Sequence, residues 1–557
     1  MAPLRGLLAF WLLLGTALAE SPPVPLPPAP AVASAHPEAT AAGAAVLELG
    51  GNAFDAAVAV SAALAVVEPY SSGLGGGGFW LLHRFRYAQD LMIDGRERAP
   101  LRARRDLYLD EQGEPIPRAS IDGPLAAGIP GEPAALVHIA RHYGRLPLSL
   151  LLAPAIHLAR EGFRVDEHYR EMARLRLDAL RASPEAARIF LVDGEVPPLG
   201  HRIVQPELAR TLERLGEEGE AGFYGGEVAQ RLVAGVQAAG GIWTQEDLDS
   251  YRVVEREPVV GHFLGHRVVS APPPSSGGVV LIEMLNMLEQ LDATHKSSAQ
   301  QVHLMIEAMR RAYEDRARYL GDPDFVEVPV ARLTDPAYAK VRAADIEPGR
   351  ATPSRPFAAA AGAGTDTTHF SIIDREGNRV AATLSINYPF GSGFVAPGTG
   401  VLLNDEMDDF SIKPGVPNVY GLVGNEANAI APGKRMLSSM SPTFVENGQR
   451  VGVLGTPGGS RIISMVLIGV LQATAGEPVE RWVGKARFHH QYLPDEVQYE
   501  PGAFTEKTRL FLEALGHRLR ELDAPYGNMQ AVAWDIPARR VTAASDPRGR
   551  GAVWVGD

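Results

Sequence analysis

Thr367 is the residue whose type and surroundings most directly suggest nucleophilic chemistry. A threonine is an effective nucleophile when it is the first residue of a chain, because its own α-amine can serve as the base. This requires cleavage of the Asp366–Thr367 bond. Most of residues 353–366, just before this bond, show neither turn motifs nor a helical or strand period, which is typical of a flexible linker. Such a linker would let a new chain end move away. An uncut edge strand with surface threonines remains the alternative from this pattern alone.

Two other polar residues are predicted to lie near Thr367. Residues 368–374 alternate polar and apolar side chains, and residues 380–386 are rich in β-branched and small ones, so we expect a hairpin. If the turn centres between residues 376 and 377, paired residue numbers add up to about 753. Thr367 then lies opposite Ile386, with Ser385 and Asn387 beside it, to within one position of register. The pattern thus gathers two hydroxyls and an amide at one end of the hairpin.

Several other motifs indicate no cofactor and no metal. The acidic run 405–409 lacks the glycine of an EF-hand calcium loop, and such runs are most often solvated. The glycine run 75–78 is followed by no Lys-Ser or Lys-Thr, so it is not a phosphate loop. His489 and His490 have no third partner at helical or hairpin spacing. His369, in the strand after Thr367, is expected to be structural rather than a general base.

The elements around these residues read as an alternation of helices and strands. Asn52 or Asp55 can cap a helix that runs to about Val67, apolar on nearly every face and therefore buried on all sides. Pro69 ends it, and the glycine run leads into a strand at residues 79–82. The alternation continues to about residue 345 without a repeat of fixed period, which argues against solenoids and propellers.

Composition removes several classes of protein. The chain has 557 residues, 46% hydrophobic and 21% charged, enough to bury a sizeable core. A net charge of −13 argues against a partner as anionic as nucleic acid. The absence of cysteine excludes disulfides, thiolate metal sites and a cysteine nucleophile.

Residues 1–19 are predicted to be a signal peptide. Arg5 precedes an apolar run at residues 7–14, and Ala17-Leu18-Ala19 is a small-x-small cleavage site before Glu20. The apolar run is short for a membrane span, and an uncleaved anchor helix is the alternative. No later apolar stretch is long enough to span a membrane. We expect a periplasmic or secreted protein without a stable membrane anchor. Its mature chain would begin with a proline-rich tether, residues 20–30, that does not join the core.

A set of motifs runs through almost the whole chain after the signal. They are Gly50–Ala57, Leu74–Phe79, Arg96-Glu97, Pro272–Gly278, Thr367–His369, Asn404–Ser411, Pro414–Asn428, Leu437–Thr443, Pro457–Arg461, Ala486–His490 and Ser545–Arg548. Together they resemble the γ-glutamyltranspeptidase (glutathione hydrolase) family of N-terminal-nucleophile hydrolases. The resemblance implies an α+β fold, a four-layer αββα sandwich. It also implies self-cleavage into a large subunit (20–366) and a small catalytic subunit (367–557) that stay intertwined as a heterodimer.

The resemblance also implies roles for individual residues. Thr367 would be the nucleophile of both self-cleavage and γ-glutamyl transfer, and Ser385 would hydrogen-bond its hydroxyl. Gly458 and Gly459 would direct backbone N–H groups at the developing oxyanion, where side chains would crowd the approach; a plain turn after Pro457 is the alternative.

The implied donor pocket recognises both charges of a γ-glutamyl group. The residues implied to bind the donor are Arg96, Asn387, Glu406, Asp409, Ser438 and Ser439. Arg96 and the two serines would hold the α-carboxylate, which suits the bidentate geometry of a guanidinium. The carboxylates and the amide would take the α-ammonium; Glu406 replaces the glutamine of several bacterial relatives, but an anion occurs there in the family. Residues 414–428, with Tyr420, match the lid loop.

Three functional hypotheses follow. The first is an enzyme that takes the γ-glutamyl group from glutathione or a related amide and passes it to water, an amino acid or a dipeptide. The second is a cephalosporin acylase-like amidase for glutaryl side chains, which have no α-ammonium and so less use for Asp409 and Glu406. The third is an unprocessed periplasmic protein that only binds glutathione. Cleavage on a denaturing gel separates the third from the others.

Overall fold

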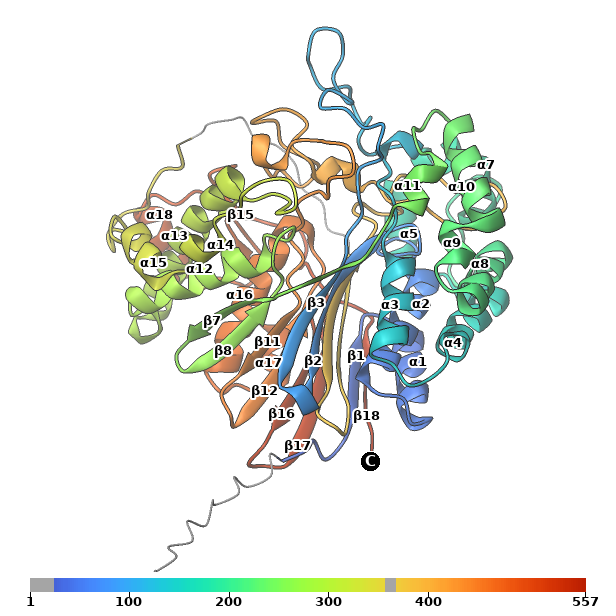
Figure 1. Ribbon diagram of the computed structural model, residues 1–557. Coiled ribbons are helices and arrows are strands. Elements are labelled where there is room, and N and C mark those ends of the chain that lie inside the picture. The colour runs from blue at the N-terminus through green and yellow to red at the C-terminus, as the bar shows by residue number, and fades with distance from the viewer. Residues whose placement is uncertain (1–24, 356–366) are drawn as a thin grey trace, which may run out of the picture.

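Four layers make up the protein: a helical layer, two β-sheets and a second helical layer (Figure 1). The computed structural model describes residues 25–355 and 367–557. The predicted signal peptide, the start of the tether, most of the linker and Asp366 lie outside the described residues. The two sheets face each other through contacts such as those of β9 and β10 with β12. The expected αββα sandwich is therefore confirmed.

The first sheet has seven antiparallel strands and mixes segments from both sides of the predicted cleavage site. In spatial order they are β18 (Ala552–Val555), β1 (Ala31–Ser34), β9 (Thr368–Ile373), β10 (Arg379–Ser385), β2 (Gly77–Arg84), β3 (Gln89–Gly95) and β6 (Val254–Arg256). Strand β2 is buried on both faces. Trp80 and Leu82 join the core under the first helical layer, and Phe79 and Leu81 join the core between the sheets.

The second sheet has six antiparallel strands. In spatial order they are β17 (Arg540–Ser545), β16 (Gln530–Asp535), β12 (Arg450–Gly455), β11 (Thr443–Glu446), β8 (His266–Ser270) and β7 (Val259–Phe263). Smaller pairings involve β13 (Phe488–His489), β14 (Val497–Tyr499) and β15 (Leu519–Glu521), and also β4 (Phe163–Arg164) and β5 (Arg202–Ile203).

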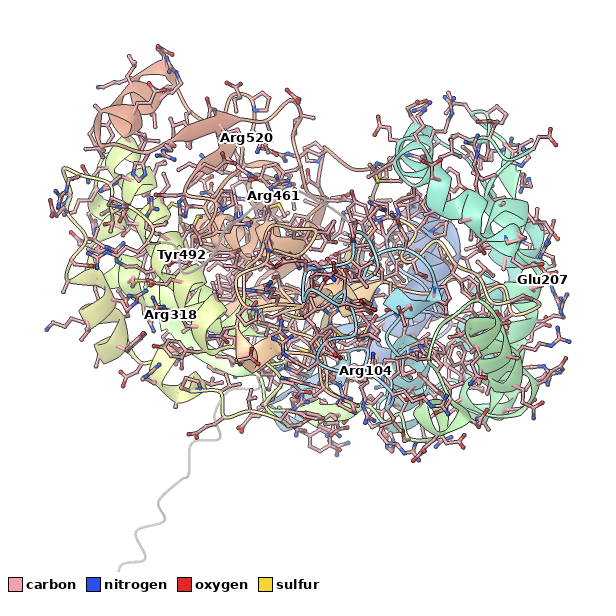
Figure 2. All side chains as sticks on the ribbon, turned by 90° about the horizontal axis from the view of Figure 1, so that it is seen from above. Arg104, Glu207, Arg318, Arg461, Tyr492 and Arg520 are labelled. Atoms are coloured by element: carbon pink, nitrogen blue, oxygen red, sulfur yellow. The ribbon has the colours of Figure 1, made fainter. Side chains whose placement is uncertain are left out.

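Helices cover the outer face of each sheet (Figures 1 and 2). On the seven-stranded side they are α1 (Pro37–Glu48), α2 (Ala53–Val67), α3 (Glu132–His142), α4 (Leu148–Glu161), α5 (Glu167–Leu175), α6 (Leu177–Ala182), α7 (Pro184–Phe190), α8 (Pro206–Glu218), α9 (Ala221–Tyr224), α10 (Gly226–Ala238) and α11 (Gln245–Asp249). On the six-stranded side they are α12 (Gly277–Gln290), α13 (Ser298–Tyr319), α14 (Val330–Leu333), α15 (Pro336–Ala343), α16 (Ile462–Thr474), α17 (Val479–Gly484) and α18 (Glu506–Ala514). Seen from above, Arg318 of α13 and Glu207 of α8 lie on opposite sides of the molecule (Figure 2).

The predicted hairpin exists, with a register one residue away from the central expectation. Thr368 pairs with Leu384, so the pairing continued by one residue brings Thr367 opposite Ser385 rather than Ile386. The cause is the turn: Asp374 joins it, and its carboxylate accepts the backbone N–H groups of Glu376 and Asn378 at 2.9 and 3.0 Å. This places the centre of the turn at residue 376.

Helix α2 begins where its cap predicts. The side chain of Asn52 accepts the N–H groups of Phe54 and Asp55, and Asp55 accepts the N–H of Asn52 at 2.9 Å, which makes a capping box. All of its residues are buried. The glycine run that follows is closely packed, because a Cβ at Gly76 would lie 2.2 Å from the carbonyl oxygen of Ser385.

Both predicted flexible segments have ends that contact the folded protein. The expectation that the tether stays out of the core is wrong for Pro27 and Pro30, which are both buried. The carbonyl of Pro30 accepts the N–H of Gly556 at 2.9 Å. The pairing of β1 with β18 brings the chain end over it. At the linker, Ser354 N–H donates to Asp495 at 2.9 Å. Across residues 25–355 and 367–557, no helix combines the length and apolarity that crossing a bilayer demands.

Candidate active site

The residues predicted to act together line one pocket. Its lining includes Arg96, Thr367, Ser385, Asn387, Glu406, Asp409, Tyr420, Ser438, Ser439 and Gly459. Gly458 faces a second cavity, of about 440 Å³, and Thr367 lines both. The first pocket encloses about 20 Å³, which is room for a water molecule. A larger ligand therefore has to displace contacts that the pocket residues now make with one another.

Thr367 lies immediately before β9, at the edge where β10 ends. Ser385 is the last residue of β10, and its hydroxyl accepts the N–H of Asn387 at 2.7 Å. Asn387 has a positive φ of 74°, and its amide donates to the carbonyl of Asp405 at 3.0 Å. This bend in the chain turns Asn387 from the sheet toward the pocket. Two hydroxyls and an amide thus meet at one end of the hairpin, as the pattern predicted.

Arg96 lies one residue beyond the end of β3 and is surrounded by carboxylates. Its guanidinium donates to Glu406 and to Asp409, both at 2.5 Å, and to Glu97 at 3.3 Å. Its Nε donates to the carbonyl of Met436 at 3.2 Å. Burial lowers the pKa of Arg96, but the three carboxylates outweigh it and the pKa is raised. Four of the five N–H donors of this guanidinium therefore already have an acceptor in the protein.

The carboxylates of the pocket are buried, and burial favours their neutral forms. Burial raises the pKa of Glu406 to about 7, although Arg96 opposes the shift. Burial also raises the pKa of Glu97 well above its usual range, with Glu406 adding to the shift. Glu406 Oε1 is buried with no hydrogen-bond partner among the described residues. The pocket thus contains an acceptor that a ligand N–H group could satisfy.

Ser438 and Ser439 are positioned by the Pro-Ser-Gly segment before α12. The N–H and the hydroxyl of Ser276 both donate to the carbonyl of Ser438, at 2.8 and 2.7 Å, and Ser438 N–H donates to Pro274. The hydroxyl of Ser438 accepts the N–H of Met440 at 3.0 Å. These bonds hold both serines at the wall of the pocket that Glu406 and Asp409 also line.

Gly458 and Gly459 form the turn that leads from β12 into α16. Both have positive φ angles, 141° and 55°, which glycine adopts without strain. A Cβ on Gly459 would lie 2.5 Å from the ring of Tyr420, and one on Gly458 would lie 2.5 Å from Met465. Side chains are therefore excluded from this turn by both conformation and space.

The segment 414–428 covers the pocket. The hydroxyl of Tyr420 donates to the carbonyl of Asn387 at 2.6 Å, and the amide of Asn418 donates to Asp409 at 3.0 Å. Val419 N–H donates to Asp408 at 2.8 Å. The loop is thus bonded to the acidic run beneath it, which is buried rather than solvated.

Two residues near the pocket were not predicted from the sequence. Arg316 of α13 donates to the hydroxyl of Ser439 at 3.3 Å. Glu68, next to the end of α2, accepts the hydroxyl of Thr368 at 2.7 Å and lines the larger cavity with Thr367. Burial raises the pKa of Glu68 to about 7. Glu68 could have been noticed in the sequence, because it is a charged residue in an otherwise apolar stretch. Arg316 lies among other charged residues of α13, so the sequence gives no signal for it.

His369, His489 and His490 line neither of the two cavities that Thr367 lines. His369 contacts the hydroxyls of Thr383 and Ser371, at 2.9 and 3.2 Å, and burial lowers its pKa to about 3. Burial also lowers the pKa values of His489 and His490, which bond to neighbouring side chains.

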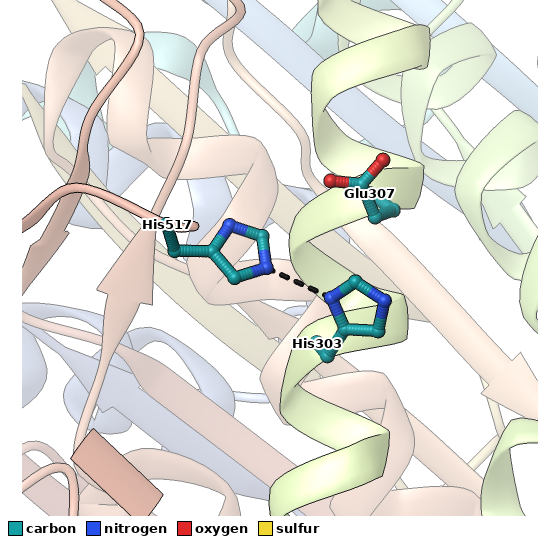
Figure 3. Close-up of side chains that lie close together, drawn as sticks. All are labelled: His303, Glu307 and His517. Atoms are coloured by element: carbon teal, nitrogen blue, oxygen red, sulfur yellow. Dashed lines mark hydrogen bonds between the residues drawn. The ribbon is translucent and has the colours of Figure 1, made fainter. Parts of the chain in front are cut away.

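One histidine cluster has potential metal-ligand spacing. His303 and Glu307 of α13 and His517 after α18 bring their ligand atoms within 4.8 Å of one another (Figure 3). His303 contacts His517 at 2.8 Å and the carbonyl of Glu347 at 2.9 Å, while Glu307 accepts Arg311 at 2.8 Å. Each of these side chains thus already has a protein partner, and the bond between His303 and His517 joins the two predicted subunits.

Comparison with known proteins agrees with the geometry. The sequence model described as gamma-glutamyltranspeptidase matches residues 39–556. The glutathione hydrolase proenzyme of Escherichia coli strain K12 is 45% identical over 525 residues, 93% of this chain and 90% of that protein. The corresponding proenzyme of Pseudomonas aeruginosa is 44% identical over 520 residues, 92% of this chain and 91% of that protein.

Solved structures of two kinds of enzyme resemble this fold. A cephalosporin acylase from Bacillus halodurans has a TM-score of 0.84 at 28% identity and covers 99% of this chain and 100% of its own. The gamma-glutamyltranspeptidase of Helicobacter pylori has a TM-score of 0.56 at 41% identity, covering 60% of this chain and 95% of the matched chain. By sequence over nearly its whole length, the protein belongs to the γ-glutamyltranspeptidase family.

Proposed function

We propose that the protein is a self-processing γ-glutamyltransferase and glutathione hydrolase. The observation that carries the proposal is the composition of one pocket, which is lined by Thr367, Arg96, Ser438, Ser439 and the acidic residues Glu406 and Asp409. A γ-glutamyl group carries an α-carboxylate and an α-ammonium next to the amide to be cleaved. The pocket has groups complementary to each of these charges.

Maturation would begin with attack of the Thr367 hydroxyl on the carbonyl of Asp366. The peptide bond Asp366–Thr367 breaks as an ester between Asp366 and the Thr367 hydroxyl forms, which frees the α-amine of Thr367. Hydrolysis of this ester then releases the Asp366 carboxylate and restores the Thr367 hydroxyl. The products are the large subunit, residues 20–366, and the small subunit, residues 367–557, which remain together as a heterodimer. The strand order supports this, because β9 and β10 of the small subunit lie between β1 and β2 of the large subunit in one sheet.

Catalysis would use the same hydroxyl a second time. The α-amine of Thr367 takes its proton as the oxygen attacks the γ-carbonyl, and the N–H groups of Gly458 and Gly459 stabilise the oxyanion. The leaving amine takes the proton, and a γ-glutamyl ester of Thr367 remains. Water, an amino acid or a dipeptide then attacks this ester and restores the free hydroxyl.

Donor binding would replace contacts that the pocket now makes internally. Arg96, Ser438 and Ser439 would bind the α-carboxylate, while Glu406, Asp409 and Asn387 would bind the α-ammonium. Glu406 Oε1, buried without a hydrogen-bond partner in the described part of the chain, supports this assignment. Tyr420 and its loop would cover the bound donor.

The same pocket argues against a glutaryl amidase. The structural similarity to a cephalosporin acylase supports this alternative. However, a glutaryl group has no ammonium group to bind Glu406 and Asp409. Without a ligand cation these two carboxylates share the single positive charge of Arg96, so an acyl group that lacks an ammonium leaves an excess of negative charge in the pocket. A passive glutathione-binding protein would have no use for the Thr367, Ser385 and glycine-turn arrangement.

Export to the periplasm or the medium is part of the proposal. It is supported by the signal-like residues 1–19 and by the family relationship to the bacterial proenzymes. The acidic net charge favours small-molecule substrates over nucleic acid.

A gel and a sequencing experiment test the proposal directly. The purified protein is expected to run as two bands of about 37 and 20 kDa, in proportion to 59.7 kDa for 557 residues. Edman sequencing of the smaller band should read Thr-Thr-His-Phe, and the preparation should release p-nitroaniline from γ-glutamyl-p-nitroanilide. A single uncut band without activity would reject the enzyme and favour a binding protein.

A further inference from the structure

Arg316 is a buried cation beside the proposed donor pocket. It lies on α13 and is 5% exposed. Its Nε donates to the hydroxyl of Ser276 at 2.9 Å, and its Nη2 donates to the hydroxyl of Ser439 at 3.3 Å. Both partners are neutral. Among the residues that the structure describes, no carboxylate lies within ion-pair distance of this guanidinium, although Asp409 lies near enough to raise its pKa against the effect of burial.

A buried charge without a counter-ion is costly. Burial of an ionised group in a protein interior costs several kcal/mol unless an opposite charge offsets it. Arginine does not avoid this cost by losing its proton at neutral pH. Arg96 differs, because it has three carboxylate partners. One guanidinium in the pocket, that of Arg96, is thus neutralised by the protein, whereas a second guanidinium directly behind Ser439, that of Arg316, has no carboxylate at ion-pair distance among the described residues.

The hydrogen bonds of the two serines point to the same kind of ligand. Ser439 Oγ accepts from Arg316, and Ser438 Oγ accepts from the N–H of Met440. Each hydroxyl thus has an acceptor position occupied, which leaves its own hydrogen to donate. Within the described residues neither hydroxyl donates to a protein group at hydrogen-bond distance. Two O–H donors backed by a cation suit a carboxylate and disfavour an ammonium group.

Arg316 also influences the second serine indirectly. Ser276, which accepts from Arg316 Nε, donates through its hydroxyl and its N–H to the carbonyl of Ser438. One guanidinium therefore orders both serines at once. Substitution of Arg316 would loosen two contacts of the proposed subsite together.

We propose that Arg316 is a positioning residue for the donor's α-carboxylate. It orients the hydroxyls of Ser439 and Ser438 toward the carboxylate and supplies a positive charge behind them, while Arg96 remains paired with Glu406 and Asp409. The inference rests on the proposed γ-glutamyl activity. It adds a second cation beside the pocket and assigns the two arginines different tasks. Arg96 connects the two charged ends of the subsite, and Arg316 sets the charge at the serine end.

The test compares two donors that differ only in the α-carboxylate. The donors are γ-glutamyl-p-nitroanilide and 4-aminobutyryl-p-nitroanilide, which keeps the amino group and lacks the carboxylate. Arg316→Gln is expected to lower kcat/KM for the γ-glutamyl donor about 10- to 100-fold, mainly through KM, as loss of a charge-assisted contact does. The 4-aminobutyryl donor should change less than about threefold. The inhibition constants of glutamate and 4-aminobutyrate should show the same split.

Controls separate this role from a structural one. Arg318→Gln removes a positive charge from the same helix, where Arg318 pairs with Glu314 at the outer side (Figure 2), and should leave both donors unchanged. Arg316→Lys keeps the charge and should recover part of the lost selectivity. If Arg316→Gln fails to fold, Arg316→Lys alone should still weaken the γ-glutamyl donor selectively.

Two results would overturn the inference. An equal fall for both donors in either Arg316 variant would make Arg316 merely structural, and an unchanged γ-glutamyl donor would remove it from the subsite. Failure of the proposed function is distinguishable, because then the parent protein itself would not turn over the γ-glutamyl donor.

Discussion

Asp409→Asn tests the opposite, ammonium-binding end of the proposed pocket. Asp409 accepts Arg96 at 2.5 Å and Asn418 at 3.0 Å, and its side chain is 12% exposed. The variant keeps the shape and the bond from Asn418, but it removes one negative charge. Arg96 retains Glu406 and Glu97, so we expect normal folding and self-cleavage.

The size of the effect follows from the kind of contact that is lost. A hydrogen bond to a charged group contributes about 1.5–3 kcal/mol, and about 1.4 kcal/mol corresponds to a factor of ten. Since Glu406 remains to bind the ammonium, kcat/KM for γ-glutamyl-p-nitroanilide should fall about 10- to 150-fold. Glutaryl-p-nitroanilide, which has the carboxylate but no ammonium, should be affected little, so the ratio of the two donors reports the contact.

The assay follows p-nitroaniline release from both donors alongside a denaturing gel. Asp408→Asn is the matched control, because Asp408 bonds to Ser120 and Val419 and does not line the pocket. It should change both donors alike, through the loop above it. If Asp409→Asn cleaves itself normally and uses the γ-glutamyl donor as well as the parent does, the assignment of the ammonium site is wrong.

Further substitutions probe three features: the nucleophile, the glycine turn and a buried carboxyl. Thr367→Ala should stay a single inactive chain, and Thr367→Ser should cleave slowly and then show weak activity, because the lost methyl group no longer restricts χ1; activity in uncut Thr367→Ala would exclude the terminal-nucleophile mechanism. Gly459→Ala places a Cβ 2.5 Å from Tyr420 at a φ of 55°, so it should lose about 1–3 kcal/mol of stability and much of kcat. Gly476→Ala, at a φ of 79° with no atom within 4 Å of the new Cβ, should show the conformational cost alone; equal kcat in the two variants would contradict the steric explanation. Burial raises the pKa of Glu68 to about 7, so the folded state holds this proton more tightly than the unfolded chain does and stability is lost as pH rises from about 4.5 to 7. In uncut Thr367→Ala protein, the free energy of unfolding in urea should be lower at pH 8 than at pH 5, and Glu68→Gln should reduce this difference by up to about 3 kcal/mol. The same pH dependence with and without Glu68→Gln would refute the role of Glu68.

Local patterns predicted the elements around the site with one residue of error. The cap of α2 and the hairpin of β9 and β10 depend on neighbours within a few positions, which a sequence displays directly. The register differed because the Asp374 side chain closes the turn, a bond that the alternation of polar and apolar residues does not encode. The acidic run 405–409 illustrates the opposite case, since composition favoured a solvated loop and the run is buried.

The sequence by itself determined the candidate nucleophile, the hairpin that presents it and, through its motifs, the family. Only the tertiary structure decided how the charges pair. Arg96 meets Glu406 and Asp409 from more than three hundred positions away, and Arg316 meets Ser439 but no carboxylate among the described residues. The energy of a charge depends on its burial and on its partners in space. Neither quantity is expressed in the spacing of residues along the chain.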